Sequence, residues 1–263
     1  MKPNRFQQAL ATRGSAVGTM IMEFGTRGIA KILSASEADF VVLDMEHTSF
    51  DAAHIGDLCA WLKATDIAPF VRVPQDLYHF CARTLDAGAL GIMVANVESA
   101  AQAKAIVDAC KYAPLGKRGI ALGTAHSDYV VPSPKEYFNY ANQNTTVIAM
   151  IESPAGLNNL DAIASTAGVD MLWVGHYDLT SNMGIAGEFQ HPDFLAALAS
   201  VTAAAKRHGK VAAIQPTNMD QARQWRAIGF QVLSYSIDIA IYRQAVSAGI
   251  ASLNEILADA PSS

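Results

Sequence analysis

Few of the 263 residues are charged, and the basic ones are not clustered. Asp, Glu, Lys and Arg together make up 16% of the chain, and the net charge is -5. Proteins that bind nucleic acid gather Lys and Arg on one surface, whereas the 19 here are scattered, so nucleic acid is not expected as a partner. With 51% hydrophobic residues, the low charge favours one large core with fully buried strands. We interpret residues 1–263 as a single domain.

Long apolar runs and closely spaced cysteines are also missing. No stretch of about 18 apolar residues occurs, so a membrane span is not expected. The N-terminal sequence M-K-P-N-R-F-Q-Q-A-L lacks the apolar centre of a secretory signal, which predicts a cytoplasmic protein. The three cysteines, Cys59, Cys81 and Cys110, lie far apart in helix-like segments. We interpret them as reduced packing residues without a catalytic role.

The glycine motifs that bind nucleotide phosphates are a third absence. The turn after the first predicted strand, M-E-F-G-T-R-G at 22–28, does not supply G-x-G-x-x-G, and no G-x-x-x-x-G-K-[ST] occurs. Nucleotide cofactors are therefore not supported, and a nicotinamide-dependent oxidoreductase is disfavoured.

What the chain does contain is a regular alternation of short apolar runs and helical patterns, after a lead-in helix that Gly14 ends. The predicted strands are 17–22, 40–44, 69–73, 91–95, 146–151, 171–174, 211–214 and 232–235. The predicted helices are 27–37, 51–65, 77–87, 99–110, 156–164, 192–208, 220–228 and 239–248, the last running on to 257. Eight strand-helix units in about 250 residues predict an α/β fold, a closed (β/α)₈ TIM barrel, with an open doubly wound sheet as the alternative.

Residues 113–144 break this rhythm. They contain Pro114, Pro132 and Pro134 and a turn-like G-K-R-G at 116–119. A long irregular segment in a compact domain is usually a functional lid or an interface element, so we expect one of these here. A helical hairpin around Tyr137–Gln143 is the alternative.

Chemistry-bearing residues follow the strand predicted at 40–44. The apolar run F-V-V-L ends in Asp44, Glu46 and His47. Because sites in parallel α/β proteins form at the carboxyl ends of the strands, His47 is a candidate general base, with Asp44 as a carboxylate that could hold its ring. The alternative is that these residues are ordinary surface groups.

Three more charged residues lie at predicted strand ends. Arg72 is the only charge in its apolar run, which predicts either an anionic substrate group or an internal Asp or Glu as its partner. Glu152 and Asp178 follow consecutive strands, which would bring their carboxylates close together. Two carboxylates at such a short distance either share a proton or bind a cation such as Mg²⁺ or Mn²⁺. Zinc stays open because His176 is nearby. The alternatives are a helix cap for Asp178 and a surface position for Glu152.

These residues belong to a set of motifs that resembles the class II pyruvate aldolases of the HpcH/HpaI family, which includes the 2,4-dihydroxyhept-2-ene-1,7-dioate aldolases. The resemblance extends over nearly the whole chain, from about Arg5 to Leu257. Single motifs of this kind are weak, but six in order are specific. They are D-M-E-H at 44–47, V-R-V-P at 71–74, L-D-A-G-A at 85–89, G-x-R-G at 116–119, I-E-S at 151–153 and V-G-x-x-D-L at 174–179.

The resemblance implies a metal-dependent barrel that makes or breaks a carbon-carbon bond of a 4-hydroxy-2-oxo acid through a pyruvate enolate. It implies Glu152 and Asp178 as ligands of Mg²⁺, Mn²⁺ or Co²⁺, and His47 as part of the acid/base machinery with Asp44 as its partner. It also implies that Arg72 binds pyruvate and steadies the enolate.

Further expectations come with the same resemblance. Asp86 would assist His47, either within one subunit or from a neighbouring subunit. The turn at Gly175 and His176 would face the pyruvate carboxylate. The resemblance implies a homohexamer, a trimer of dimers in which the last helix, about 239–257, packs on a partner subunit.

The chain also departs from the best-known members near the expected site. Met20 replaces a common Trp, Met150 replaces a Gln, Gln215 replaces an apolar residue of the acceptor pocket, and His176-Tyr177 replaces Pro-Ala. These changes predict a different aldehyde or ketone partner, or related enolate chemistry such as oxaloacetate decarboxylation or a condensation.

Two further readings are less well supported. A Schiff-base mechanism is weakened because no lysine stands alone at a strand tip; Lys31, Lys63, Lys104 and Lys111 all fall in helix patterns. A non-catalytic keto-acid-binding barrel would predict loss of the charged strand-end residues, which are all present.

Overall fold

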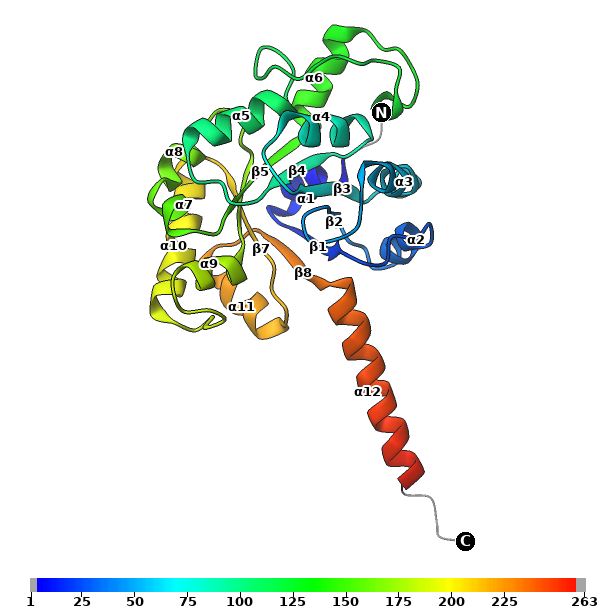
Figure 1. Cartoon of the computed structure of the whole chain (residues 1–263), viewed down its shortest axis with the longest axis vertical. Coiled ribbons are helices and arrows are strands. Elements are labelled where there is room, and N and C mark those ends of the chain that lie inside the picture. Colours follow the sequence, from blue (N-terminus) through cyan, green and yellow to red (C-terminus); the bar gives the residue numbers. More distant parts are fainter. Residues whose placement is uncertain (1–3, 259–263) are drawn as a thin grey trace.

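The computed structural model describes residues 4–258, and within them eight parallel strands form a closed barrel (Figure 1). Each strand pairs with the next in sequence, and β1 also pairs with β8, which closes the sheet. The predicted (β/α)₈ barrel is therefore confirmed. The strands are β1 (Ala16–Ile21), β2 (Phe40–Asp44), β3 (Ala68–Val73), β4 (Gly91–Val94), β5 (Thr146–Ile151), β6 (Met171–Val174), β7 (Val211–Ile214) and β8 (Val232–Ile237).

Helices surround the barrel between consecutive strands (Figure 1). They are α2 (Ile29–Ser34), α3 (Ala52–Leu62), α4 (Tyr78–Asp86), α5 (Ala100–Cys110), α6 (Pro134–Asn144), α7 (Pro154–Asn158), α8 (Leu160–Ala164), α9 (His176–Asn182), α10 (Pro192–Arg207) and α11 (Met219–Ile228). Two more helices lie outside this alternation, α1 (Arg5–Arg13) before β1 and α12 (Asp238–Ala258) after β8. The helix predicted at 156–164 is in fact two short helices, α7 and α8. The segment 113–144 contains a 3₁₀ turn (Ala125–Ser127) and the single helix α6 instead of a hairpin.

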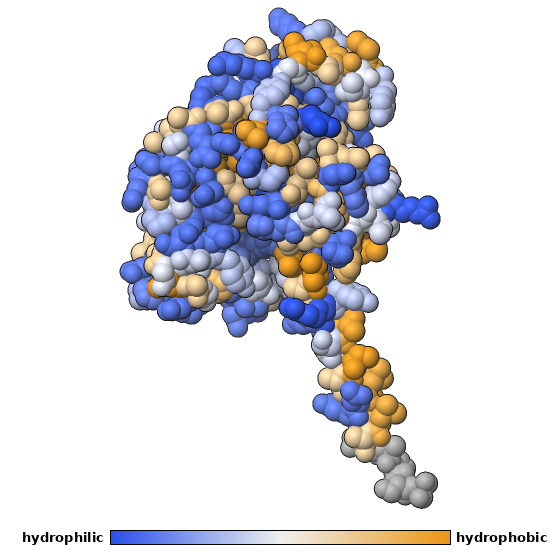
Figure 2. All heavy atoms as spheres, viewed as in Figure 1, coloured by the Kyte–Doolittle hydropathy of each residue, from blue (hydrophilic) through white to orange (hydrophobic). Residues whose placement is uncertain are grey.

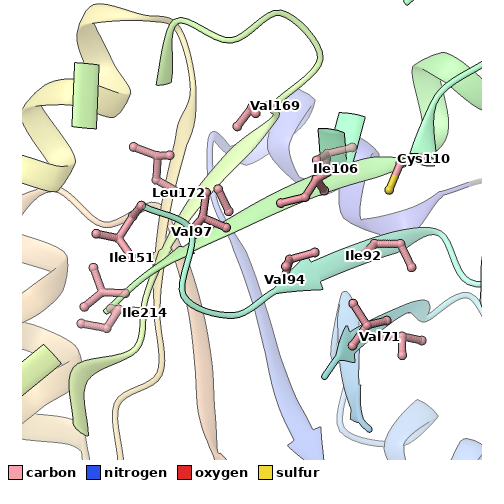
Figure 3. Close-up of a cluster of buried hydrophobic side chains, with 14 of the residues drawn as sticks. Val71, Ile92, Val94, Val97, Ile106, Cys110, Ile151, Val169, Leu172 and Ile214 are labelled. Atoms are coloured by element: carbon pink, nitrogen blue, oxygen red, sulfur yellow. The ribbon is translucent and has the colours of Figure 1, made fainter. Parts of the chain in front are cut away.

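The strands are buried on both faces, in two separate hydrophobic layers. Alternate residues of a strand point to opposite sides, so Phe40 and Val42 pack inside the barrel while Val41 and Leu43 pack against the helices. Figure 3 shows part of the outer layer, in which the strand residues Val71 and Ile92 belong to the same cluster as the helix residue Ile106. This double burial explains why the strands are short, continuous apolar runs.

One end of the barrel is closed by α1. Phe6 packs edge-on against Phe40 and Phe70, with ring centroids 5.6 and 4.8 Å apart, and fills the amino-terminal end of the barrel. Asp39 binds Arg5 and Arg13 on α1. Because this end is filled by side chains, the opposite, carboxyl-terminal end is where a ligand can enter.

The last helix extends away from the barrel (Figure 1). α12 starts at Asp238, directly after β8, and carries exposed apolar side chains at Tyr242, Val246, Ile250 and Leu253. They recur every three or four residues and form an apolar stripe, visible along this helix in Figure 2. Among the described residues, no helix has the length and hydropathy needed to cross a membrane.

The three cysteines are all buried and free, as expected. Burial raises the pKa of the Cys59 thiol to about 12, which keeps it protonated and unreactive at neutral pH.

Candidate active site

The carboxyl ends of β2, β3 and β5 carry Asp44, Arg72 and Glu152, and the alternation of side chains directs all three toward the inside of the barrel. Asp44 and Arg72 lie directly opposite each other in the register of β2 and β3. Ile151 of β5 pairs with Val174 of β6, so the residues that follow them, Glu152 and Gly175, lie side by side just beyond the ends of the two strands. The barrel thus brings residues that are far apart in sequence to one mouth.

Arg72 is held by two carboxylates. Its Nε and Nη2 donate to the two oxygens of Asp44 at 2.7 and 2.9 Å, and Nε lies 3.2 Å from Oε2 of Glu46. Burial alone would lower the pKa of Arg72, but the hydrogen bonds and charges of Asp44 and Glu46 outweigh it, and the pKa is raised. Arg72 is therefore a fixed, permanent cation. Of the two partners predicted for Arg72, the internal carboxylates are present, as Asp44 and Glu46. Arg72 also lines the cavity at this mouth, so the contact with an anionic substrate group stays a prediction.

His47 lies at the same mouth but is not held by Asp44 in the way we expected. The Asp44 carboxylate accepts hydrogen bonds from the backbone N–H groups of Glu46 and His47, at 3.0 and 3.2 Å, and so shapes the loop. The imidazole ring is 58% exposed as a side chain, and its Nε2 lies 3.7 Å from Oε2 of Glu46. Glu46, to which the sequence assigned no role, thus links the histidine to Arg72, and burial raises its pKa.

Glu152 is a buried carboxylate beside Asp178. It is 6% exposed, and its Oε1 accepts a hydrogen bond from the backbone N–H of Asn96 at 2.6 Å. Burial, followed by the charge of Asp178, raises the pKa of Glu152 to about 7. Glu152 lies against Gly175, the N-cap of the helix whose first turn carries Asp178, so the two acids come from adjoining positions at this mouth. Its burial shows that Glu152 is not the surface residue of the alternative interpretation.

Asp178 lies in the first turn of α9, whose N-cap is Gly175. The alternative in which Asp178 caps a helix is therefore wrong. A Cβ atom on Gly175 would lie 2.2 Å from Oε2 of Glu152, so only glycine allows the turn to pass this close to the carboxylate. Met150, expected in the pocket, packs in the barrel interior, and its methyl group would lie 2.8 Å from the same Cβ.

The donor set at this mouth fits a cation that keeps open positions. In the part of the chain that the structure describes, no group of three or more His, Cys, Asp or Glu side chains converges as a metal site. Glu152 and Asp178 would supply two carboxylate ligands and leave the other positions for water and substrate oxygens, the pattern typical of Mg²⁺ or Mn²⁺.

His176 is buried among aromatic rings. Its ring centroid is 4.6, 5.1 and 5.4 Å from those of Tyr177, Phe189 and Trp225. Burial lowers the pKa of His176 to about 4, so the ring is neutral at pH 7. Tyr177, by contrast, is exposed.

A cavity of about 710 Å³ opens over these residues. Gln215, expected in the acceptor pocket, lies on its wall, where its Nε2 donates to the backbone oxygen of Ser236 at 2.5 Å. The wall is formed by Met20, Met22, His47, Arg72, His176, Tyr177, Asp178, Gln215, Thr217, Ser236, Ile237, Ala240, Arg243 and Gln244.

Asp86 is not part of this mouth within one chain. It is the last residue of α4, which ends near the start of β4, so it lies toward the amino-terminal end of the barrel. There it accepts a hydrogen bond from Nη2 of the buried Arg118 at 2.6 Å, and Nε2 of His126 lies 3.7 Å away. Only a second chain could bring an Asp86 to His47.

Comparison with known proteins gives consistent matches. The family described as HpcH/HpaI aldolase/citrate lyase matches residues 25–245. A 5-keto-4-deoxy-D-glucarate aldolase of Klebsiella pneumoniae is 32% identical over 243 residues, which cover 92% of this chain and 94% of that protein. The HpcH/HpaI aldolase structure from Desulfitobacterium hafniense has a TM-score of 0.90 at 28% identity, covering 97% of both chains. The citrate synthase SbnG has a TM-score of 0.86 at 25% identity, covering 97% of this chain and 100% of that one.

Proposed function

Because the chain belongs to the HpcH/HpaI aldolase/citrate lyase family, we propose that it is a divalent-metal-dependent lyase that cleaves a 4-hydroxy-2-oxo acid into pyruvate and an aldehyde. One observation carries the proposal. The carboxylates of Glu152 and Asp178 are neighbours at the mouth that also holds Arg72 and His47, beneath a cavity large enough for a small keto acid. We expect the enzyme to act in the cytoplasm on small-molecule substrates.

Glu152 and Asp178 would hold Mg²⁺, Mn²⁺ or Co²⁺. A bound divalent cation supplies positive charge that stabilises an enolate. The raised pKa of Glu152 supports this assignment, since a carboxylate that burial and a neighbouring acid destabilise is one that a cation would stabilise in its ionised form.

The chain's own residues would bind pyruvate and move protons. Arg72, fixed by Asp44 and Glu46, would donate to the keto or carboxylate oxygen of pyruvate and steady the enolate. His47, exposed at the mouth, would remove the proton of the 4-hydroxyl group as the carbon-carbon bond breaks. The backbone turn at Gly175 and His176 would face the pyruvate carboxylate.

The assembly belongs to the same proposal. We expect a single-domain subunit that forms a homohexamer, a trimer of dimers, in which α12 packs on a partner and Asp86 assists His47 of a neighbour. The exposed apolar stripe of α12 and the position of Asp86 away from its own His47 support this arrangement.

A second candidate uses the same enolate in a condensation or in decarboxylation of oxaloacetate. The likeness to the citrate synthase SbnG favours the condensation. Gln215 supports a polar acceptor in either case, as does the sugar-acid substrate named for the relatives that are 32% identical. Comparing aldehydes, oxaloacetate and other keto acids as acceptors separates these reactions.

The first test detects the enolate without requiring the aldehyde. With Mg²⁺, Mn²⁺ or Co²⁺ in D₂O, the protein should exchange the methyl protons of pyruvate for deuterium, measured by NMR, and EDTA should abolish the exchange. Glu152→Ala should lose both the exchange and calorimetric binding of Mn²⁺, whereas Glu188→Ala, at an exposed position, should keep both. Exchange that persists in EDTA would reject the metal assignment.

A further inference from the structure

The loop between β4 and α5 holds the carboxylate of Glu152 from one side. Oε1 of Glu152 accepts a hydrogen bond from the backbone N–H of Asn96 at 2.6 Å. The other oxygen, Oε2, lies against Gly175, where an added Cβ atom would be 2.2 Å away. A hydrogen bond from a backbone donor to an ionised carboxylate is short and strong, so it restricts rotation of the group. The N–H of Asn96 thus determines where Oε2 points.

Asn96 has a left-handed backbone conformation that serves this contact. Successive N–H groups of an extended chain point to opposite sides, whereas a left-handed residue lets neighbouring N–H groups point the same way. The N–H of Asn96 reaches Glu152, and that of Val97 reaches the backbone oxygen of Met150 at 2.9 Å, so both meet the carboxyl end of β5.

The conformation of Asn96 is not explained by packing of its own side chain, which is exposed. Its φ is 54°, a value that costs free energy for residues other than Gly, and least for Asn and Asp. Residues held in this region cluster at functional sites, where the surrounding structure maintains them. The strained residue here is the one that donates to Glu152.

Contacts on both sides of Asn96 keep the loop in place. The side chain of Gln102 on α5 donates to the backbone oxygen of Asn96 at 3.3 Å and accepts the backbone N–H of Glu98 at 2.9 Å. The carboxylate of Glu98 accepts a hydrogen bond from Oγ of Ser153, the residue after Glu152, at 2.6 Å. The loop is therefore joined both to its own helix and to the segment that carries Glu152.

We propose that Asn96 is the positioning residue of Glu152: its left-handed backbone holds Oε1 and keeps Oε2 turned toward the helix that carries Asp178. This inference rests on the proposed function, because it concerns the cation that Glu152 and Asp178 would hold. The role belongs to the backbone of Asn96 and not to its amide group, and this decides which substitutions are tolerated.

The test is a series of substitutions at Asn96 that differ in how readily they adopt a positive φ. Gly adopts it freely, Ala at a cost and the β-branched Val least readily. Mn²⁺ affinity, measured by calorimetry without pyruvate, should follow this order. Asn96→Gly should bind like the parent, Asn96→Ala about 10-fold more weakly and Asn96→Val up to about 100-fold more weakly, the range typical for loss of a partner of a metal ligand. Asn96→Ala, the milder change, decides the question if Asn96→Val does not fold.

Glu37→Val is the matched control. Glu37 is exposed, has a φ of 60° and lies between α2 and β2, so the substitution strains the backbone equally but away from the site. It should lose stability like Asn96→Val and bind Mn²⁺ like the parent.

Three results would overturn the assignment: weak binding by Asn96→Gly, which would transfer the role to the amide group, parent-like binding by Asn96→Ala, or an equal loss of affinity in Glu37→Val. A parent that does not bind Mn²⁺ fails the proposed function, whereas a parent that binds it, with an affinity that does not depend on residue 96, fails only this inference.

Discussion

Glu152 is the residue whose protonation the site controls most strongly. Its pKa rises from the usual 4.5 to about 7 because it is buried beside Asp178. Between pH 4.5 and about 7 the folded metal-free protein therefore binds one more proton than the unfolded chain. The contribution of Glu152 to the free energy of unfolding is highest below pH 4.5, and this stabilisation is lost as the pH rises through 7. Ionisation of Glu152 at pH 8 then costs the metal-free fold about 3 kcal/mol, since one pKa unit corresponds to about 1.4 kcal/mol.

Glu152→Gln should remove this cost. In EDTA at pH 8 the variant should be more stable than the parent by up to about 3 kcal/mol, and at pH 4 the two should be alike, as measured by urea unfolding at equal protein concentration. Glu188→Gln at an exposed position is the control. Added Mn²⁺ should stabilise the parent and not the variant. A stability difference that does not change with pH would show that Glu152 is not the titrating group.

Side-chain alternation explains which site residues could be predicted. Asp44, Arg72 and Glu152 continue the inward-facing positions of buried strands, a pattern visible in the sequence. The contact of Glu46 with Arg72 and the position of Arg243 arise from tertiary packing, and no local pattern encodes them. Glu46 is part of the motif D-M-E-H, so its position next to His47 in the sequence is the one feature that could have predicted its role at the site.

At the scale of elements, the junction of β8 and α12 organises one side of the site. The buried carboxylate of Asp238 accepts hydrogen bonds from the backbone N–H groups of Met22, Glu23 and Phe24, at 3.0, 2.9 and 2.8 Å, and from that of Ile239 at 2.9 Å. One side chain thus joins the loop after β1 to the start of α12.

Asp238→Asn should loosen this junction. The amide has one acceptor oxygen in place of two, so some of the four N–H groups lose their partner, and we expect a loss of about 1–3 kcal/mol in the free energy of unfolding. Because Met22 and Arg243 line the cavity on the two joined elements, kcat/KM should fall as well. Asp193→Asn, at an exposed position on α10, is the matched control. Unchanged unfolding and kinetics in Asp238→Asn would show that the junction is held by other contacts.

The strands were easier to predict than the helices, for a physical reason. A strand buried on both faces is a continuous apolar run, as in β2, and each predicted strand is present. α9 was missed because its sequence, H-Y-D-L-T-S-N, is short and has no apolar periodicity. α7 and α8 were joined because the break at Asn159, whose side chain binds the backbone oxygens of Glu98 and Ala155, depends on a contact with another loop.

At the scale of the whole molecule, α12 packs on its own barrel only near its start, where Tyr242 contacts Phe24 edge-on, and the rest of the helix extends away (Figure 1). Its 21 residues span about 30 Å at 1.5 Å per residue, and Tyr242, Val246, Ile250 and Leu253 form an exposed apolar stripe (Figure 2). Such a stripe on a helix away from its own core marks a protein interface. In the proposed hexamer, a second copy of this chain packs against the stripe.

Charge in the stripe should therefore break the assembly. Val246→Asp together with Ile250→Asp should lower the mass measured by light scattering after gel filtration, whereas Gln244→Glu, which lies off the stripe, should not. If Asp86 serves the His47 of a neighbour, the dissociated protein should also lose turnover. Mixing inactive Asp86→Asn and His47→Ala subunits should restore activity, because a mixed oligomer contains sites in which an intact histidine meets an intact aspartate. Mixed oligomers that stay inactive would confine Asp86 to its contact with Arg118.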